Sequence, residues 1–128
     1  MEVTIADIEK YLEEVKIAIN AGKYRIEMND RRQDNQDFFM DYIIDEEKRK
    51  QILLSLTALD FSEILPNEHA GYEHEMLYVF GKDINLLHRF DAGEESISLY
   101  IKFNKLGSNY VIVISFHKQR YPLKYKFK

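Results

Sequence analysis

The sequence predicts an α+β domain in which N-terminal helices pack on an antiparallel sheet dominated by a C-terminal hairpin. Three observations predict this class. Apolar residues recur at helical spacing in the first twenty residues, residues 96–104 alternate between apolar and polar side chains, and residues 110–118 are almost continuously apolar. With 128 residues and 45% hydrophobic content, the chain is most simply one domain spanning residues 1–128.

The first element is predicted to be a helix over residues 3–21. Its apolar residues lie three or four positions apart and form one stripe: Ile5, Ile8, Leu12, Val15 and Ile19. Thr4 and Asp7 match a capping box with a shortened acid, and Gly22 has the place of a terminating glycine.

The next segments are predicted to be a strand, a loop and a second strand. Residues 24–28 alternate and predict a short strand, whereas residues 29–37 contain no apolar side chain and predict a loop. Arg31 and Arg32 lie in that loop, where either solvation or a phosphate contact is open to them. Residues 38–44 are apolar and aromatic and predict a strand.

A second helix is predicted to begin after Asp45, which is a favourable capping residue. Its buried stripe is predicted to contain Ile52, Leu53, Leu56 and Leu59, and the helical region is predicted to end or kink before Pro66. The polar loop 67–75 contains two histidines five positions apart, a spacing that does not match a helical or strand metal pair, so no metal site is predicted. A strand at 76–80, a turn at 81–83 with Leu86 and Leu87 packed inward beyond it, and an acidic loop at 91–95 follow.

The last third of the chain is predicted to form a hairpin and a final strand. Placing Asn104 opposite Asn109 gathers the apolar residues of both hairpin strands on one face, with Tyr100 near Val113. The other face then carries Lys102, Tyr100, Ser115 and His117. Residues 123–127 alternate with lysines and predict an edge strand, whose lysines either block aggregation or contact nucleic acid.

Charge is distributed unevenly along the chain. From Ser96 onward there are 7 basic and no acidic residues, whereas the preceding part holds 22 acidic and 11 basic residues. This asymmetry favours a polyanionic partner, although the net charge of −4 argues against a nonspecific DNA coat. The chain has no cysteine, no signal-peptide pattern and no long apolar run, so we expect a cytoplasmic protein.

Three segments resemble the motility quorum-sensing regulator (MqsR) toxins, a family of bacterial type II toxin–antitoxin ribonucleases with a RelE-like fold. The segments are the first helix followed by A-G-K-Y (residues 21–24), I-L-L-S-L-T-A-L-D-F-S-E (residues 52–63), and L-Y-I-K-F with V-I-V-I-S-F-H (residues 99–103 and 111–117). The resemblance implies an mRNA-cleaving toxin that needs no cofactor and is neutralised by a partner antitoxin.

The resemblance also carries over individual positions. Tyr100 matches the tyrosine that the family uses at its active site, whereas His117 and Glu63 stand where the family has lysines. Glu75 is the residue nearest to the family's active-site glutamine.

Metal-free RNA cleavage needs a base, an acid and cations that stabilise the charged phosphate. We expect this role for His117, Tyr100, Lys102 and Arg120, and we expect RNA contacts from three further residues, Lys105, Lys118 and Tyr121. A second class remains open, in which the same fold is a catalytically inactive module that binds a protein. No glycine-rich phosphate loop or serine nucleophile elbow is present in the sequence.

Overall fold

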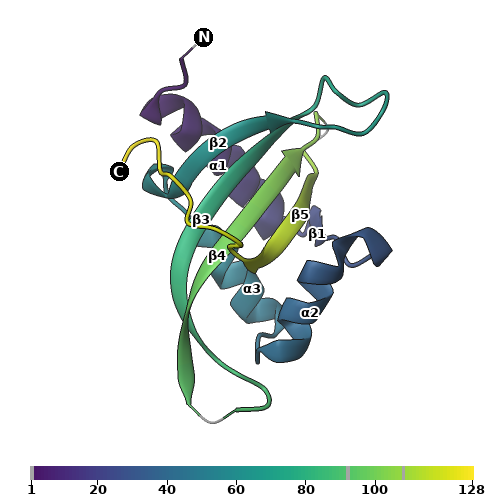
Figure 1. The fold of residues 1–128 in the computed structure, drawn as a ribbon. Helices are drawn as coiled ribbons and strands as arrows, with labels where there is room; N and C mark the ends of the chain where they lie inside the picture. The colour runs from purple at the N-terminus through teal and green to yellow at the C-terminus, as the bar shows by residue number, and fades with distance from the viewer. Residues whose placement is uncertain (1, 92, 108) are drawn as a thin grey trace.

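The computed structural model describes residues 2–91, 93–107 and 109–128, and it confirms the predicted α+β architecture, with helices packed on a mostly antiparallel sheet (Figure 1). The helical elements are α1 (Ile5–Asn20), η1 (Asp30–Arg32), α2 (Gln33–Asp41), α3 (Glu46–Leu54) and η2 (Ala58–Asp60). The strands are β1 (Tyr24–Ile26), β2 (Phe61–Pro66), β3 (Met76–Leu87), β4 (Glu94–Lys105) and β5 (Val111–Lys118). The sheet order is β1-β5-β4-β3-β2, with β1 parallel to β5 and the other neighbours antiparallel.

Helix α1 forms as predicted, one or two residues shorter at each end. The Thr4 hydroxyl accepts a hydrogen bond from the Asp7 amide at 3.2 Å, and the Asp7 carboxylate accepts one from the Thr4 amide at 2.9 Å. Gly22 follows the helix with a φ of 75°, the left-handed conformation that glycine adopts readily. The inward face of α1 packs against the sheet, where Tyr11 stacks on Tyr78.

The segment between residues 29 and 41 differs from its prediction. It is not a loop followed by a strand but the short turn η1 followed by helix α2. The buried residues of α2 are Asn35, Phe38 and Phe39, and the two phenylalanines pack their rings on Phe116 of β5. The segment is helical because Asn35, Phe38 and Phe39 lie three and four positions apart. They form one inward stripe, whose first member is polar.

Helix α3 begins after Asp45 as predicted but ends at Leu54, and residues 61–66 form the edge strand β2 instead of a continued helical region. Leu59 is therefore exposed, whereas Leu56 remains buried. The predicted turn at 81–83 is also wrong, because β3 continues through Gly81, which pairs with Tyr100. Leu86 points into the core as predicted, but its neighbour Leu87 is exposed.

The predicted hairpin of β4 and β5 is confirmed, but its predicted register is wrong. Asn104 pairs with Ile112 instead of Asn109, and Tyr100 pairs with His117 instead of lying near Val113. A β-bulge lies between the pairs formed by Lys102 and Phe103, so that Ile114 is an extra residue on β5. The bulge lets Val111, Val113 and Phe116 all face the core although their spacing is not uniformly two.

Residues 119–128, which we call the C-terminal strap, do not form the predicted final strand. The strap leaves the end of β5, crosses the sheet on the face opposite the helices and ends beside Phe61 (Figure 1). Its anchors include a hydrogen bond from the Gln119 amide to the Ser98 carbonyl at 2.8 Å and one from the Lys126 amide to the Phe61 carbonyl at 3.1 Å. The predicted alternation survives, because the three lysines of the strap are exposed and the side chains between them are half-buried.

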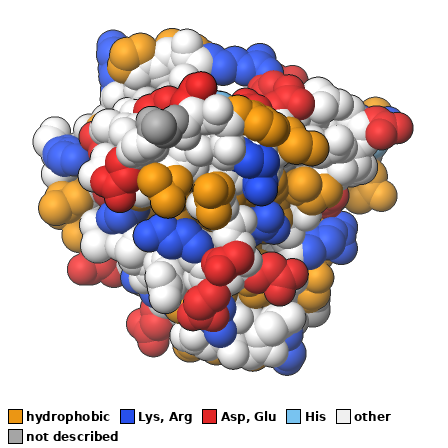
Figure 2. Space-filling view, turned by 90° about the horizontal axis from the view of Figure 1, so that it is seen from below, with side chains coloured by type: hydrophobic (Ala, Val, Ile, Leu, Met, Phe, Trp, Pro, Cys, Tyr) orange, Lys and Arg blue, Asp and Glu red, His pale blue; other side chains and the backbone are white. Residues whose placement is uncertain are grey.

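Viewed from below, the surface carries acidic, basic and hydrophobic side chains that are interspersed (Figure 2). None of the helices in the described residues combines the length and the apolar character that a bilayer crossing requires.

Candidate active site

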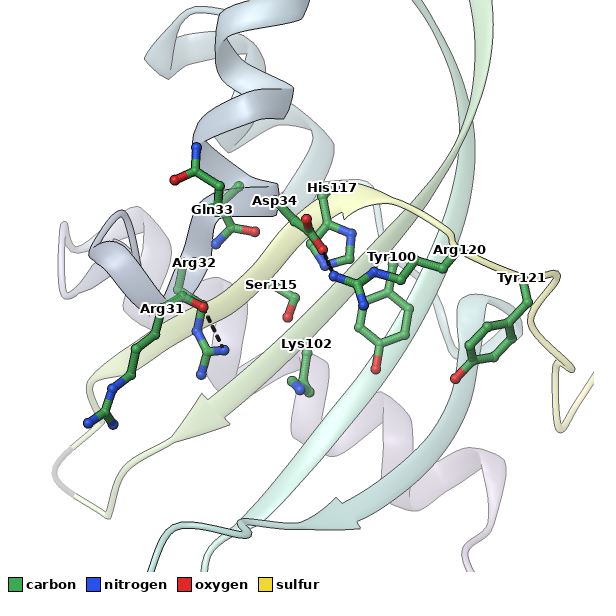
Figure 3. A pocket seen from close by; sticks show the side chains of 11 residues that line it. Arg31, Arg32, Gln33, Asp34, Tyr100, Lys102, Ser115, His117, Arg120 and Tyr121 are labelled. Atoms are coloured by element: carbon green, nitrogen blue, oxygen red, sulfur yellow. Dashed lines mark hydrogen bonds and ion pairs between the residues drawn. The ribbon is translucent and has the colours of Figure 1, made fainter.

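A cavity of about 380 Å³ lies on the face of the sheet opposite the core, beside η1 and the start of α2 (Figure 3). Its residues come from three places: η1 and α2, the centres of β4 and β5, and the first residues of the C-terminal strap. The lining residues are Arg31, Arg32, Gln33, Asp34, Asn35, Tyr100, Lys102, Ser115, His117, Arg120 and Tyr121. The cavity thus brings together all four predicted catalytic residues and one of the predicted RNA contacts, Tyr121.

Tyr100 and His117 line one end of the cavity together. They are direct partners in the β4–β5 register, and their rings stack with centroids 5.4 Å apart and planes 10° apart. The Nδ1 atom of His117 lies 2.7 Å from the carbonyl oxygen of Lys118. Because a carbonyl only accepts hydrogen bonds, Nδ1 carries a proton. In the neutral ring, Nε2 is therefore the atom that can accept a proton from a substrate.

The surroundings of Tyr100 favour the protonated form of its hydroxyl. Burial raises the pKa of Tyr100, and Tyr121 and Glu63 raise it further. A protonated phenol can donate either a hydrogen bond or a proton to an oxygen that develops negative charge.

Lys102 pairs with Ser115 across the same strands and is half-buried. Burial lowers the pKa of Lys102, the charge of Arg32 lowers it further, and Glu68 opposes both effects. In the described part of the chain, no carboxylate lies within ion-pair distance of Lys102. Its ammonium is therefore available to an anion that enters the cavity.

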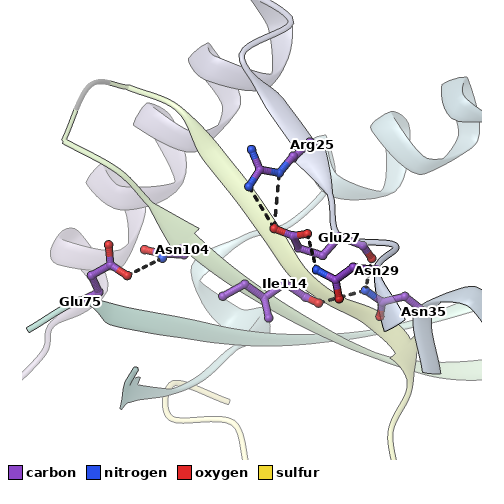
Figure 4. A network of polar contacts seen from close by, with 7 residues as sticks. All are labelled: Arg25, Glu27, Asn29, Asn35, Glu75, Asn104 and Ile114. Atoms are coloured by element: carbon purple, nitrogen blue, oxygen red, sulfur yellow. Dashed lines mark hydrogen bonds and ion pairs between the residues drawn. The ribbon is translucent and has the colours of Figure 1, made fainter. Parts of the chain in front are cut away.

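Asn35 holds the bulge that orients the β5 side of the cavity (Figure 4). Its side chain is fully buried; Nδ2 donates to the carbonyls of Glu27 at 2.8 Å and Ile114 at 2.9 Å, and Oδ1 accepts from the Phe116 amide at 2.8 Å. These bonds continue the ladder of β5 beyond the end of the short strand β1, and they leave Ser115 and His117 on the cavity side.

Arg120 and Tyr121 belong to the strap and line the outer part of the cavity. The Arg120 guanidinium donates to the carboxylate of Asp34, which brings α2 and the strap together across the cavity. Both partners are partly exposed to solvent, so the pair can open without a large desolvation cost. Tyr121 is 66% exposed, which leaves its ring free to stack on a ligand.

The structure places the other two predicted RNA contacts, Lys105 and Lys118, away from this cavity. The Lys105 ammonium lies 3.7 Å from the carboxylate of Glu14 and over the ring of Tyr11, on the helical side of the sheet. The Lys118 ammonium lies 3.4 Å from the Glu95 carboxylate and over the ring of Tyr42. Strand alternation places both lysines on the side of the helices, because Lys105 follows the buried Phe103 by two positions and Lys118 follows the buried Phe116 by two positions.

The two acidic positions taken from the resemblance also differ in their surroundings. Glu63 pairs with Val79 at the edge of the sheet and is close enough to Tyr100 to influence its pKa. Glu75 instead accepts hydrogen bonds from Asn67 and Asn104, each at 3.0 Å, and has a structural role at the other end of the sheet.

Sequence reasoning missed the contribution of η1 and α2 to the site. The sequence predicts a loop in which Arg31 and Arg32 are either solvated or in contact with a phosphate, whereas in the structure they belong to η1 and line the cavity beside Lys102. The signal was the spacing of Asn35, Phe38, Phe39 and Tyr42, which is helical although its first member is polar. Among the described residues, no group of three or more histidines and carboxylates is arranged to hold a metal ion.

Comparison with protein-family models, curated proteins and solved structures found no match for this chain. The resemblance to the MqsR toxins therefore remains an expectation from the sequence.

Proposed function

We propose that this chain is a metal-independent endoribonuclease that cleaves mRNA, and that it is the toxin of a type II toxin–antitoxin system with a RelE/MqsR-like fold. The observation that carries the proposal is the stacked pair of Tyr100 and His117 beside Lys102, in a cavity where basic side chains outnumber acidic ones. A base, an acid and a cation are the three groups that cleavage through the 2′-hydroxyl requires.

In the proposed reaction, the phosphorus is transferred from the 5′-oxygen of the next nucleotide to the 2′-oxygen of the same ribose. Nε2 of His117 removes the proton of the 2′-hydroxyl, and the 2′-oxygen attacks the phosphorus. The bond from phosphorus to the 5′-oxygen of the next nucleotide then breaks, and that oxygen takes the proton of the Tyr100 hydroxyl. The products are a 2′,3′-cyclic phosphate and a 5′-hydroxyl end.

Lys102 and Arg120 stabilise the negative charge that develops on the phosphate oxygens. Lys102 lies beside the stacked pair and has no carboxylate of its own within ion-pair distance in residues 2–91, 93–107 and 109–128. Arg120 is held by Asp34 in the free protein, and an entering phosphate replaces that carboxylate with a bidentate partner. Tyr121 stacks on a base at the outer edge of the cavity.

A second candidate is a catalytically inactive module that binds a protein partner, and one apolar surface favours it. The end of α2 and the end of β3 lie side by side, because the Ile43 amide donates to the Leu87 carbonyl at 2.9 Å. This contact gathers several side chains that are about half exposed or more: Met40, Ile43, Leu87 and Phe90. Such a surface fits a protein partner, which is an antitoxin in the first proposal and a regulated protein in the second.

The test is cleavage of a mixed-sequence RNA by the purified protein in EDTA, with analysis of the product ends. We expect wild type to cut and the His117→Ala and Tyr100→Phe variants to lose at least about 100-fold in rate, the usual contribution of a general acid or base. Thermal stability should change little, since both rings are half-buried in the wall of the cavity and do not belong to the core. The same variants should abolish growth inhibition in cells.

Lys105→Gln is the matched control, because Lys105 lies on the helical side of the sheet. It should cut at the wild-type rate. Equal cutting by wild type and His117→Ala would indicate a contaminant or another site. Absence of cutting by every variant would remove the ribonuclease and leave the binding module.

A further inference from the structure

Arg31 and Arg32 line the cavity, but the proposed reaction does not use them. They follow one another in η1 and are exposed and half-exposed, respectively. Figure 3 shows both side chains on one side of Lys102, whereas Tyr100, Arg120 and Tyr121 lie on the other side. The cavity therefore has a second cationic end, separate from the end where the stacked rings are found.

The backbone that presents the two arginines is held in place by side chains of the same segment. The Arg31 amide donates to the side chain of Asn29 at 3.0 Å, which caps η1. Nε2 of Gln36 donates to the carbonyls of Met28 at 2.6 Å and Asn29 at 3.1 Å. Asn35 connects the same segment to β5 (Figure 4). The two guanidinium groups thus extend from a fixed base, which is what a specific anion site requires.

The charges at this end of the cavity are not balanced by acidic residues. In the part of the chain that the structure describes, no carboxylate lies within ion-pair distance of Arg31 or Arg32, and Asp34 is engaged by Arg120. Arg32 is close enough to Lys102 for its charge to lower the pKa of Lys102, an effect that Glu68 opposes, so the two cations repel one another. Such repulsion is relieved by a bound anion.

We propose, on the basis of the proposed ribonuclease function, that Arg31 and Arg32 form a second phosphate subsite, which binds the phosphate next to the scissile one on the same single strand. Arginine is suited to this task because its planar guanidinium can donate two parallel hydrogen bonds to one phosphate. A ligand with two phosphates should therefore bind more tightly than a ligand with one.

The test is binding of short, labelled 2′-O-methyl RNA, which cannot be cleaved through its 2′-oxygen. Fluorescence anisotropy over a range of NaCl concentrations gives the slope of log affinity against log salt, to which each phosphate contact on a single strand contributes about −0.7. We expect the double variant Arg31→Gln/Arg32→Gln to have a slope shallower by roughly 0.7 for the one phosphate that it no longer contacts. It should also lose the preference for a trinucleotide, with two phosphates, over a dinucleotide, with one.

Two controls separate this result from a general loss of charge or of structure. Lys10→Gln/Lys48→Gln makes the same change in net charge at exposed positions on α1 and α3, across the sheet from the cavity, and should leave the slope unchanged. Arg31→Lys/Arg32→Lys keeps the charge and should retain the slope but bind the trinucleotide more weakly than wild type. Trinucleotides that extend on the 5′ side or on the 3′ side of a common dinucleotide show which neighbouring phosphate is bound.

The outcomes also separate the subsite from the function on which it rests. If wild type cleaves RNA but Arg31→Gln/Arg32→Gln has the wild-type slope and trinucleotide preference, the subsite is wrong and the ribonuclease stands. The subsite is also wrong if Lys10→Gln/Lys48→Gln loses as much of the salt slope and of the trinucleotide preference as Arg31→Gln/Arg32→Gln does. If wild type neither cleaves RNA nor binds the trinucleotide, both proposals fall.

Discussion

Asn35 determines which side chains of β5 reach the cavity. Beyond the end of β1, strand β5 has no neighbouring strand on that side, and the Asn35 amide takes the place of one. It bonds the Ile114 carbonyl and the Phe116 amide on either side of Ser115. A single buried polar side chain thereby fixes the bulge on which the orientation of His117 depends.

Replacing Asn35 with alanine should therefore affect both stability and activity. The Ile114 carbonyl and the Phe116 amide would lose their partner, and each buried group left unsatisfied costs about 1–3 kcal/mol. We expect Asn35→Ala to lower the free energy of unfolding by about 2 kcal/mol or more, measured by urea denaturation, and to slow RNA cleavage. Asp37→Ala, at an exposed position on the same helix, should change stability by less than about 0.5 kcal/mol. Wild-type stability of Asn35→Ala would mean that other contacts hold the bulge.

Individual residues also show where the sequence was informative and where it was not. Tyr100, Lys102, Ser115 and His117 were predicted to share one face, and they do, because strand alternation is preserved on either side of the bulge. Lys105 and Lys118 were predicted to contact RNA from their charge, but the same alternation puts them two positions after Phe103 and Phe116, on the helical side, where they lie over Tyr11 and Tyr42.

At the level of elements, the C-terminal strap depends on a glycine in a strand beneath it. A Cβ atom at Gly81 would lie 2.7 Å from Cδ1 of Leu123 and 2.8 Å from Nε2 of Gln119, and closer still to the hydroxyl of Tyr125. The strap can pass this close to β3 because the strand has no side chain at Gly81. The strap in turn carries Arg120 and Tyr121 into the cavity.

Gly81→Ala should therefore displace the strap without disrupting the sheet beneath it. Overpacking of this kind typically costs about 1–3 kcal/mol. We expect faster cleavage by trypsin after Lys124 and Lys126, read by mass spectrometry, and weaker binding of RNA because Arg120 is displaced from the cavity. Gly107→Ala is the matched control, since a Cβ there meets no atom within 4 Å. If the two variants are digested at the same rate, the strap is not held by its contact with Gly81.

Elements with strong local signals were predicted well, and those set by distant contacts were not. The capping box of α1 and the cap of α3 are local, so both starts were found. Gly81 was predicted to form a turn, because the sequence near it does not show why a strand would need a glycine there. The reason lies in Leu123 and Tyr125, more than forty residues later, which leave no room for a side chain at Gly81. Helix α2 was missed because its polar first turns carry no apolar signal, and its packing on Phe116 depends on the tertiary structure.

At the level of the whole molecule, five of the seven basic residues from Ser96 onward either pair with a carboxylate or line the cavity. Lys105, Lys118 and Lys126 lie within ion-pair distance of Glu14, Glu95 and Glu2, respectively. Lys102 and Arg120 lie in the cavity, where they meet the arginines of η1. The molecule has a net charge of −4, and its cationic cavity combines basic residues from the end of the chain with those of η1.

This distribution of charge predicts a preference for single strands over duplexes. A single strand can place one or two phosphates in a cavity of about 380 Å³, whereas most of the backbone of a duplex would stay outside it. We expect a single-stranded 2′-O-methyl RNA of about ten nucleotides to bind at least about tenfold more tightly than the duplex with its complement, because affinity falls with every phosphate that the protein fails to neutralise. Anisotropy titrations of both forms at one salt concentration provide the measurement.

Duplex DNA of the same sequence is the control for a general attraction to polyanions, and it should bind as weakly as the RNA duplex. If the duplexes bind as tightly as the single strand and the variant Lys124→Gln/Lys128→Gln weakens them, the exposed lysines of the C-terminal strap are the nucleic-acid contact rather than the cavity. The lysines of the strap would then contact nucleic acid rather than block aggregation, the two roles that the sequence pattern allows. If that variant leaves single-strand binding unchanged, those two lysines only keep the strap exposed to solvent, and recognition depends on the cavity between η1, β4 and β5.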